Sequence, residues 1–475
     1  MDGASMSRGT LLSQLAYSLG APEPALRLLV SVLIGYPLAI IHRHTLYGHL
    51  LQYQHLFFVV SGLSIGYFNY GWEVLHSVAS VLVVYGVLKI IGGTLISVIC
   101  IFIFTMGYLL AGYYMTGTET YDIKWSMPQC VLTLRLIGLA FDLFDGKKLE
   151  EELSQEQKKK ALSKIPSLLE VAGYTYFPAS FLVGPQFSMR RYLDFVAGIF
   201  RDEVETFQTD ELPNCLVPGL KRGGLGFVYL GLYQVGILFF PDSYLLGKEF
   251  QELPFWKRCL TLGLWGKITL YKYISCWLIS EGVCITAGLT YNGKDSSGKS
   301  RWDGCANVKL RVFEGATKFG HFITSFNINT NNWVAQYVYK RLKFLGNRYI
   351  SQAAALVFLA VWHGLHSGYY MCFLLEFVIM KLEKDLEAML EQSEIKEFLR
   401  HGVLRPLTWL VLKLYTFVFM GYCLVPFVLL SYPRWNHVYM SVYYFGHFVF
   451  FPWPLYSPFV KKLLKLWKLR RSHRE

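Results

Sequence analysis

The stretch TLISVICIFIFTMGYLLAGYY, residues 94–114, contains no charged side chain. About 20 apolar residues in a helix cross a hydrocarbon core of about 30 Å, so this stretch is long enough to span a bilayer. In water, such a helix would expose apolar side chains on every face. Residues 94–114 therefore predict a chain whose solvent is lipid over much of its length.

The composition extends this prediction to the whole chain of 475 residues. Hydrophobic residues make up 53% and charged residues only 17%, whereas soluble domains carry about 25% charge. This excludes a disordered, collagen-like or coiled-coil protein. There are 46 Lys and Arg residues against 33 Asp and Glu residues, a net charge of +13. In a membrane protein this excess marks cytosolic loops and tails, so we expect membrane lipids and not nucleic acid as partners.

Apolar runs recur along the chain and predict an all-α polytopic membrane protein with about ten or eleven transmembrane helices. Some runs are short, polar-interrupted or broken by proline, and these we expect to be re-entrant or interfacial. Besides 94–114, the runs are 28–41, 56–70, 74–91, 131–140, 223–241, 260–289, 349–375, 407–430 and 439–459.

The hydrophilic stretches between these runs are too short to form a soluble domain, and no repeat of fixed period is present. We expect one transmembrane catalytic domain over 25–460, an N-terminal segment 1–24 without signal-peptide features, and a basic tail 461–475. The tail alternates Lys and Arg with Leu and Trp, a pattern typical of a helix on a headgroup surface. By the positive-inside rule the C-terminus is then cytosolic.

The nine cysteines are scattered and form no C-x-x-C pair. Most lie within apolar runs, so we expect reduced thiols and neither a disulfide framework nor a metal centre.

Two histidines stand out in the run 349–375, which lacks Asp, Glu, Lys and Arg. His363 and His366 lie in VWHGLHSG, residues 361–368, and on one continuous helix they would share a face. Ionisable groups at membrane depth are functional candidates because their burial is costly. A hydrogen-bonded structural role is the alternative. Only Cys372 could join the pair as a metal ligand, so we expect no metal site.

A second polar cluster is SFNINTNNW, residues 325–333, which holds four asparagines before a helical pattern over 333–344. At least two of the four fit an ordinary turn or N-cap. The basic stretch KRLK, residues 340–343, follows, and either a phosphate-bearing substrate or lipid headgroups would suit it.

The asparagine cluster and the downstream WHG together resemble the catalytic pair of the membrane-bound O-acyltransferase (MBOAT) family. Three further stretches extend the likeness over about 15–447 and are similar to the branch that acylates lysophosphatidylcholine in vertebrates: DIKWSMP at 122–128, PSLLEVAG at 166–173 and LVGPQFSM at 182–189. The resemblance assigns His363 as the catalytic histidine and Asn327 as its paired asparagine.

The resemblance also implies a many-helix MBOAT fold in the endoplasmic reticulum membrane. The implied reaction moves an acyl chain, preferably polyunsaturated, from acyl-coenzyme A to the sn-2 hydroxyl of a lysophospholipid, preferably lysophosphatidylcholine. Acyl-coenzyme A is then a co-substrate, and no bound cofactor is expected. The last four residues, SHRE, are not a dilysine retrieval signal, so retention in the reticulum rests on the resemblance alone.

Acyl transfer from a thioester to an alcohol fits this pair of residues. A neutral imidazole can take the hydroxyl proton, and burial favours the neutral form of His363. The amide of Asn327 can orient the acyl carbonyl and stabilise the oxyanion, or it can fix the tautomer of the histidine. No serine or cysteine nucleophile motif accompanies the pair, so we expect direct transfer in a ternary complex.

The remaining site residues are predictions of binding and support. His366 supports His363 without reacting, and Pro185 forms a structural turn. The coenzyme A phosphates are expected to meet the basic residues Lys340, Arg341 and Lys343 at a cytosolic mouth. Trp333 and Asn331 are expected to lie near the thioester. Contact with lipid headgroups is the alternative for the basic residues.

Alternatives from other classes make distinct demands on the sequence. A transporter would need ion-coupling carboxylates or an inverted repeat, and neither pattern is present. Acyltransferases that use a His and an Asp five positions apart are excluded, because no histidine here has that partner. An MBOAT that acylates a protein or another lipid remains the runner-up, and a homodimer stays open as the assembly state.

Overall fold

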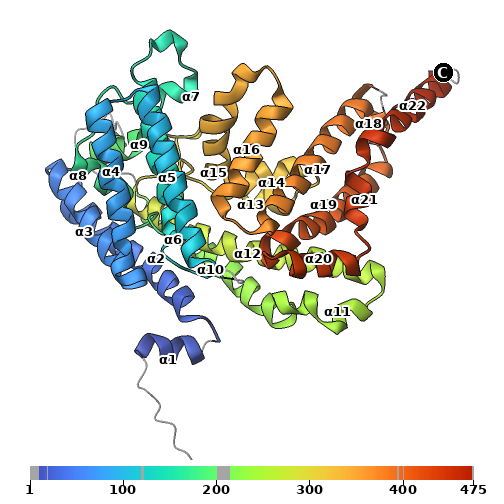
Figure 1. The fold of residues 1–475 in the computed structure, drawn as a ribbon, viewed down its shortest axis with the longest axis horizontal. Coiled ribbons are helices and arrows are strands. Elements are labelled where there is room, and N and C mark those ends of the chain that lie inside the picture. Colours follow the sequence, from blue (N-terminus) through green and yellow to red (C-terminus); the bar gives the residue numbers. More distant parts are fainter. Residues whose placement is uncertain are drawn as a thin grey trace, which may run out of the picture. The chain divides into compact units, whose positions relative to one another are not determined.

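The computed structural model describes residues 10–18, 20–118, 122–200, 214–392, 395–399 and 401–472. In these ranges the chain is helical, with one isolated β-bridge between Lys294 and Ser300 and no strand (Figure 1). The all-α prediction is confirmed. Residues 1–9 of the predicted N-terminal segment, 201–213 of a hydrophilic stretch and 473–475 of the basic tail lie outside the described residues.

The chain divides into two compact units, and the first comprises residues 1–117, 122–228 and 275–307. It contains a large apolar core cluster, to which α3, α4, α6 and α8 contribute side chains such as Phe58, Val84, Leu136 and Val171. Its helices are α1 Leu11–Ser18, α2 Glu23–Ile41, η1 His42–Leu46, α3 Leu51–Tyr70, η2 Gly71–Val74, α4 Leu75–Ile91, α5 Leu95–Thr116, α6 Ser126–Asp145, η3 Glu150–Glu152, α7 Gln155–Lys158, α8 Leu168–Thr175 and α9 Met189–Val196.

The second unit comprises residues 118–121, 229–274 and 308–475. Two helices, α10 Leu216–Phe239 and α12 Phe255–Ala287, contribute residues to both units. The others in this unit are η4 Asp242–Leu246, α11 Lys248–Glu252, α13 Leu310–Glu314, α14 Phe319–Ser325, α15 Ile328–Val334, η5 Ala335–Tyr339, η6 Lys340–Leu345, α16 Arg348–His363, α17 Ser367–Gln392, α18 Ile395–Leu399, α19 Leu404–Leu429, α20 Tyr432–Ser441, α21 Phe445–Phe450 and α22 Trp453–Ser472.

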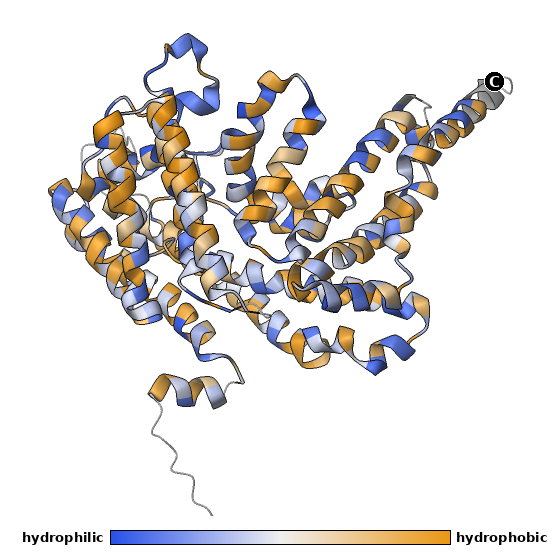
Figure 2. Ribbon diagram, in the orientation of Figure 1, coloured by the Kyte–Doolittle hydropathy of each residue, from blue (hydrophilic) through white to orange (hydrophobic). Residues whose placement is uncertain are grey.

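Six helical stretches in the described residues are long and apolar enough to cross a membrane: Glu23–Leu46, Leu51–Ile91, Leu95–Thr116, Ser126–Asp145, Leu216–Leu246 and Leu404–Leu429. The predicted span 94–114 is confirmed as α5, whose N-terminus is fixed by a capping box between Thr94 and Ser97. The helices α4 and α5 are hydrophobic over most of their length, whereas the loop around α7 is hydrophilic (Figure 2). The chain is a multi-pass membrane protein.

Two of the predicted runs are not continuous helices. The run 349–375 is divided between α16 and α17, and the run 439–459 is divided among α20, α21 and α22. The second division falls where Tyr443 and Tyr444 adopt positive φ angles of 54° and 49°, which a helix cannot contain. Each break divides the apolar run between helices, and neither run is among the six stretches.

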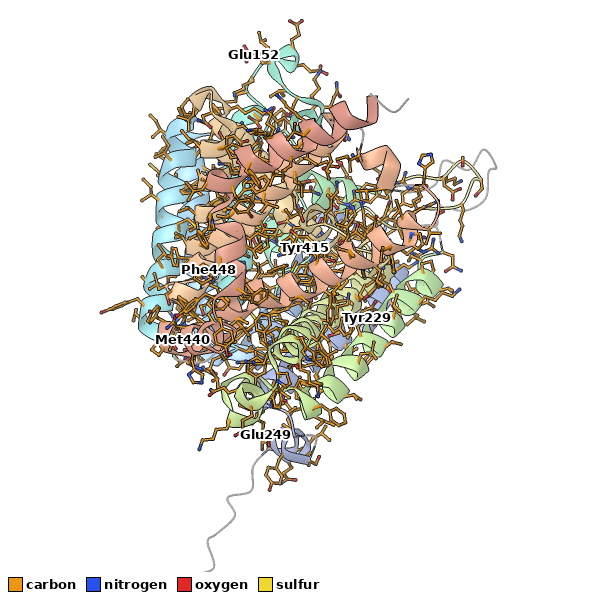
Figure 3. All side chains as sticks on the ribbon, turned by 90° about the vertical axis from the view of Figure 1, so that its right-hand side faces the viewer. Glu152, Tyr229, Glu249, Tyr415, Met440 and Phe448 are labelled. Atoms are coloured by element: carbon orange, nitrogen blue, oxygen red, sulfur yellow. The ribbon has the colours of Figure 1, made fainter. Side chains whose placement is uncertain are left out.

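Several structural predictions outside the site can be compared directly with the fold. All nine cysteines are free thiols. Pro185 is buried in the irregular segment that follows the turn at 181–183, so it lies just after a turn and not within one. Its neighbour Gln186 donates a hydrogen bond to the carbonyl of Val131 at 2.8 Å. In the second unit, large apolar side chains such as Met440 and Phe448 are exposed on the surface, as expected where lipid is the solvent (Figure 3).

Candidate functional site

The two stretches that carry the catalytic prediction form an antiparallel helical hairpin in the second unit. The helix α15 continues through η5 and η6 to Gly346, and the chain then returns as α16. Asn347 caps α16 by accepting hydrogen bonds from the N–H groups of Tyr349 and Ile350. The rings of Trp333 and Phe358 stack at 5.6 Å and fix the register of the hairpin.

This register places Asn327 level with the end of α16. Trp333 lies six residues after Asn327, and Phe358 lies six residues before Gly364, which is about 9 Å of helix rise in each arm. In an antiparallel helix pair, residues that lie equally far along the two helices from one contact, in opposite sequence directions, are at the same height. Asn327 and His363, far apart in the sequence, therefore lie at one end of the hairpin.

Asn327 occupies an unusual backbone position. It precedes the first residue of α15 with φ 48° and ψ 44°, the left-handed conformation, and its side chain does not cap the helix. Asparagine tolerates this region better than other non-glycine residues, and such outliers concentrate at functional sites. The ordinary N-cap interpretation therefore does not explain this asparagine.

His363 is the last residue of α16, because Gly364 has φ 145° and ψ −171°. Only glycine adopts this conformation readily. The structure corrects the prediction that His363 and His366 share one helical face: the helix ends between them, and α17 begins at Ser367. The histidine thus projects from a helix end and not from the middle of a span.

Aromatic rings surround the imidazole of His363. Ring centroids lie at 5.6 Å for Tyr369, 5.5 Å for Phe373 and 5.0 Å for Phe427. His363 as a residue is partly exposed, and no hydrogen bond joins its ring to any residue that the structure describes. A histidine with apolar walls and no protein partner keeps its ring nitrogens available for a substrate.

The start of α17 is fixed against the end of α19. The N–H of Gly368 donates to the carbonyl of Leu430 at 2.9 Å, and a Cβ at this glycine would lie 1.8 Å from the carbonyl oxygen of Pro426. The indole N–H of Trp435 donates to the hydroxyl of Ser367 at 3.2 Å. The small residues after His366 therefore allow close helix packing.

The other predicted site residues have contacts of their own. His366 packs edge-on to Tyr369 at 6.3 Å, the same ring that contacts His363. Asn331 donates from its amide to the carbonyls of Ile323 and Phe326, both at 3.0 Å, and so ties α14 to α15. Trp333 is buried in its stack with Phe358. Substrate contact by Asn331 and Trp333 stays a prediction.

The basic residues gather at the other end of the hairpin. Lys340 and Lys343 of η6 are exposed, and Arg341 between them is partly exposed. Sequence reasoning missed three cations that the fold adds: Arg348 at the start of α16, and Lys381 and Lys384 of α17. Lys381 lies 5.4 Å from the Tyr349 ring, and Lys384 donates to Gln352 at 3.2 Å. These six residues form the basic mouth.

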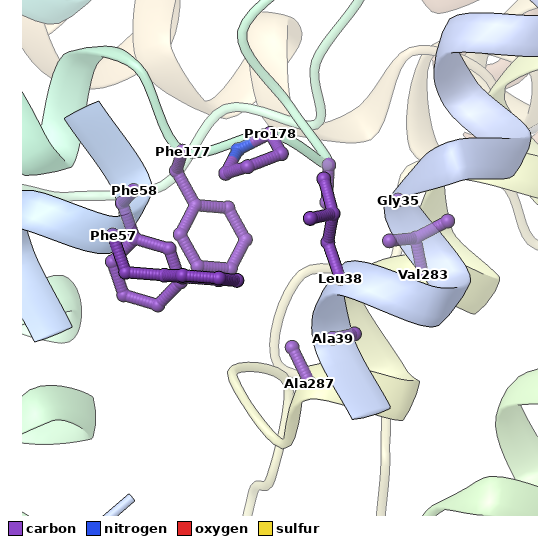
Figure 4. Close-up of a pocket in the computed structure, with 10 residues that line it drawn as sticks. Gly35, Leu38, Ala39, Phe57, Phe58, Phe177, Pro178, Val283 and Ala287 are labelled. Atoms are coloured by element: carbon purple, nitrogen blue, oxygen red, sulfur yellow. The ribbon is translucent and has the colours of Figure 1, made fainter. Parts of the chain in front are cut away.

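The first unit contains a small cavity walled by apolar residues only, among them Leu38, Phe57, Phe177 and Val283 (Figure 4). It offers no group for acid–base chemistry. No cluster of three or more His, Cys, Asp or Glu side chains suited to a metal ion occurs in the part of the chain that the structure describes.

Comparison with known proteins supports the resemblance found in the sequence motifs. Residues 110–425 match the sequence model of MBOAT, the membrane-bound O-acyltransferase family. Lysophospholipid acyltransferase 5 of Homo sapiens is 46% identical over 95% of this chain and 92% of its own length. The protein of the same name from Drosophila melanogaster is 46% identical over 92% and 87%.

A more distant relative is also named as a membrane-bound O-acyltransferase. Membrane-bound glycerophospholipid O-acyltransferase 2 of Homo sapiens is 27% identical over 94% of this chain and 87% of its own length. The matches cover both the asparagine and the histidine stretches, and they extend over nearly the whole polypeptide. The protein is a homologue of lysophospholipid acyltransferase 5 and belongs to the membrane-bound O-acyltransferase family.

Proposed function

We propose that this enzyme transfers an acyl chain, preferably polyunsaturated, from acyl-coenzyme A to the sn-2 hydroxyl of lysophosphatidylcholine and related lysophospholipids. The observation that carries the proposal is the 46% identity to lysophospholipid acyltransferase 5 over nearly the full length of both chains. The acceptor and donor preferences rest on the sequence resemblance. The products are a diacyl phospholipid and free coenzyme A.

His363 is proposed as the general base. Its imidazole takes the proton of the sn-2 hydroxyl as the oxygen attacks the thioester carbonyl, and the proton then passes to the departing coenzyme A thiolate. The aromatic walls and the absence of a hydrogen bond to any described residue support this role. Asn327, at the same level of the hairpin, orients the acyl carbonyl or stabilises its oxyanion. His366 supports the site through Tyr369.

The basic mouth is proposed to meet the coenzyme A phosphates on the cytosolic side. Lys340, Arg341 and Lys343 were expected there from the sequence, and Arg348, Lys381 and Lys384 enlarge the same positive region. By the positive-inside rule this end of the hairpin is cytosolic, as is the C-terminus. Asn331 and Trp333 would lie near the thioester.

The setting of the enzyme is proposed from the family. We infer a multi-pass protein of the endoplasmic reticulum membrane with about ten or eleven helices crossing or entering the bilayer, beyond the six stretches that qualify by length and composition. Residues 25–460 form the catalytic domain between the segment 1–24 and the basic tail 461–475. A homodimer is compatible with this arrangement.

Purified protein in lipid nanodiscs, given lysophosphatidylcholine and a polyunsaturated acyl-coenzyme A, tests the proposal. We expect His363→Ala to lower kcat by about 10² to 10⁴ and Asn327→Ala by about 10² to 10³. His44→Ala, which alters an exposed histidine, is the control and should leave the rate unchanged. Normal turnover by folded His363→Ala, or transfer to a peptide but not to lysophospholipid, would contradict the proposal.

Direct transfer is tested separately. Labelled acyl-coenzyme A without acceptor should leave the protein unlabelled, because no covalent intermediate is formed. Stoichiometric acylation of the protein would show a two-step mechanism instead.

A further inference from the structure

Glu376 is a carboxyl group in the apolar half of α17 that the mechanism above does not use. It follows Phe373 by one helical turn and lies before the cations Lys381 and Lys384. Its side chain is partly buried. An ionisable residue in this setting is costly to bury, so it needs a partner or a function.

The other carboxylates of α17 have protein partners. Glu383 accepts hydrogen bonds from the N–H of Phe319 and the hydroxyl of Tyr415. Asp385 accepts from the indole of Trp453 at 2.9 Å, and Glu387 forms ion pairs with Lys318 and Lys396. Glu376 has neither a hydrogen bond nor an ion pair with any residue in the described ranges. Among the described residues, its carboxyl oxygens are therefore left available to a ligand.

The position of Glu376 along the hairpin is set by contacts on both sides of it. Phe373 stacks on the ring of His363, and Met380 and Lys384 both reach Gln352 near the start of α16. Residues 373, 376, 380 and 384 recur at helical spacing and form one stripe on the face toward α16. Glu376 thus lies between the catalytic histidine and the basic mouth.

A second set of neighbours places Glu376 on the inner side of this stripe. The thiols of Cys372 on α17 and Cys423 on α19 both lie within electrostatic range of its carboxyl group. Residue 376 follows the buried Cys372 by four positions, so the two residues share one face of α17. Since α17 packs against both α16 and α19, Glu376 lies on a face of the helix that borders other helices.

A ligand that runs from the basic mouth to His363 passes this carboxyl group. In acyl-coenzyme A the phosphates and the thioester are joined by a pantetheine arm, whose amide nearest the sulfur lies two carbons from it. That amide would lose its water when it entered an apolar channel, at a high cost unless a partner replaced the water. A carboxyl oxygen accepts an N–H hydrogen bond in either protonation state.

We propose that Glu376 accepts a hydrogen bond from the amide N–H nearest the thioester of the acyl donor and so positions the thioester carbonyl beside His363. This inference rests on the proposed function and names a residue that selects the donor class. Glu376 is a positioning residue, because the transferred atoms do not touch it.

The test compares two small donors, an acyl N-acetylcysteamine thioester, which has this amide, and the matching acyl propyl thioester, which lacks it. With wild-type enzyme and lysophosphatidylcholine, kcat/KM should favour the amide donor by about tenfold to a hundredfold, as expected for a hydrogen bond to a charged group. Glu376→Leu should abolish this preference and raise KM for acyl-coenzyme A without changing KM for lysophosphatidylcholine. Glu376→Gln, which retains an acceptor oxygen, should restore part of the preference.

The matched control is Glu387→Gln, which removes a paired carboxylate from the same helix and should leave the donor preference at its wild-type value. An unchanged donor preference in folded Glu376→Leu, or a change confined to lysophospholipid headgroup selection, would overturn the inference. Failure of the proposed function is distinguishable, because the wild-type enzyme would then acylate no lysophospholipid from either donor or from acyl-coenzyme A.

Discussion

The surroundings of Arg135 in the first unit differ sharply from those of His363 in the second. Arg135 is buried in α6, where its two terminal nitrogens make four hydrogen bonds, to the carbonyls of Tyr174, Thr175 and Ser180 and to the hydroxyl of Ser180. Its guanidinium also lies 4.8 Å from the ring of Phe187. His363 has rings around it but no hydrogen bond to any described residue.

The difference separates two uses of a polar group at membrane depth. Arg135 holds the irregular segment after α8 in place, because that segment's carbonyls would otherwise lie in an apolar core without donors. The imidazole of His363 stabilises no backbone and is open to a substrate. Substitution of a polar group that is hydrogen-bonded within the protein should mainly lower stability. Substitution of a polar group without such hydrogen bonds should mainly lower activity.

The largest expected effect is on activity alone. His363→Ala should lose about 10² to 10⁴ in kcat while its unfolding midpoint stays close to that of the wild type, because no hydrogen bond of the fold is removed. Acyl transfer and thermal unfolding measured on the same nanodisc sample check this. A large drop in the midpoint would mean that His363 is a structural residue like Arg135.

The opposite pattern is expected for Arg135. Arg135→Ala leaves several buried carbonyls without donors and should lower the free energy of unfolding by about 3 kcal/mol or more. The fraction that remains folded should retain a near-normal kcat per active molecule. Thermal unfolding and active-site titration of the folded fraction separate the two quantities; a specific loss of kcat without destabilisation would break the comparison.

An intermediate effect is expected at the helix end beside the histidine. Gly364→Ala must place an alanine at φ 145° with its Cβ 3.0 Å from the ring of Tyr369, at a cost of about 1–3 kcal/mol. Activity should also fall, because Tyr369 contacts His363. The control Gly320→Ala has open space around its Cβ and should not destabilise the protein. Equal stability of the two variants would contradict this account.

The smallest effect is expected at a single hydrogen bond near Arg135. Tyr174 donates to the carbonyl of Phe187 at 2.8 Å, and Tyr174→Phe removes only this bond. The free energy of unfolding should fall by about 1 kcal/mol with no change in kcat. A double variant with Arg135→Lys shows whether the two residues act together, since coupled neighbours deviate from additivity.

Most of the fold class and the candidate catalytic residues could be predicted from the sequence. Charge-free runs predict membrane helices because the bilayer allows few alternatives, and the structure confirms the helical chain and the span at 94–114. The prediction of one continuous helix over 361–368 was wrong, because Gly364 ends the helix although the sequence stays apolar beyond it.

Other features required the tertiary structure. The run 349–375 ends one residue before Glu376, so that carboxyl group fell outside the stretch considered for chemistry. Arg348, Lys381 and Lys384 are scattered in the sequence and gather only because α16 and α17 fold back on each other. No local pattern encodes which groups lack a partner.

By itself the sequence determined that this protein is a helical membrane acyltransferase, and it singled out Asn327 and His363 as the proposed reacting pair, because hydropathy and motif identity are local properties. Only the tertiary structure decided that Asn327 and His363 lie at one end of a hairpin whose register is fixed by Trp333 and Phe358. It also decided that Glu376 lies between that end and the basic mouth. Distances between remote segments depend on packing, and packing depends on the whole chain.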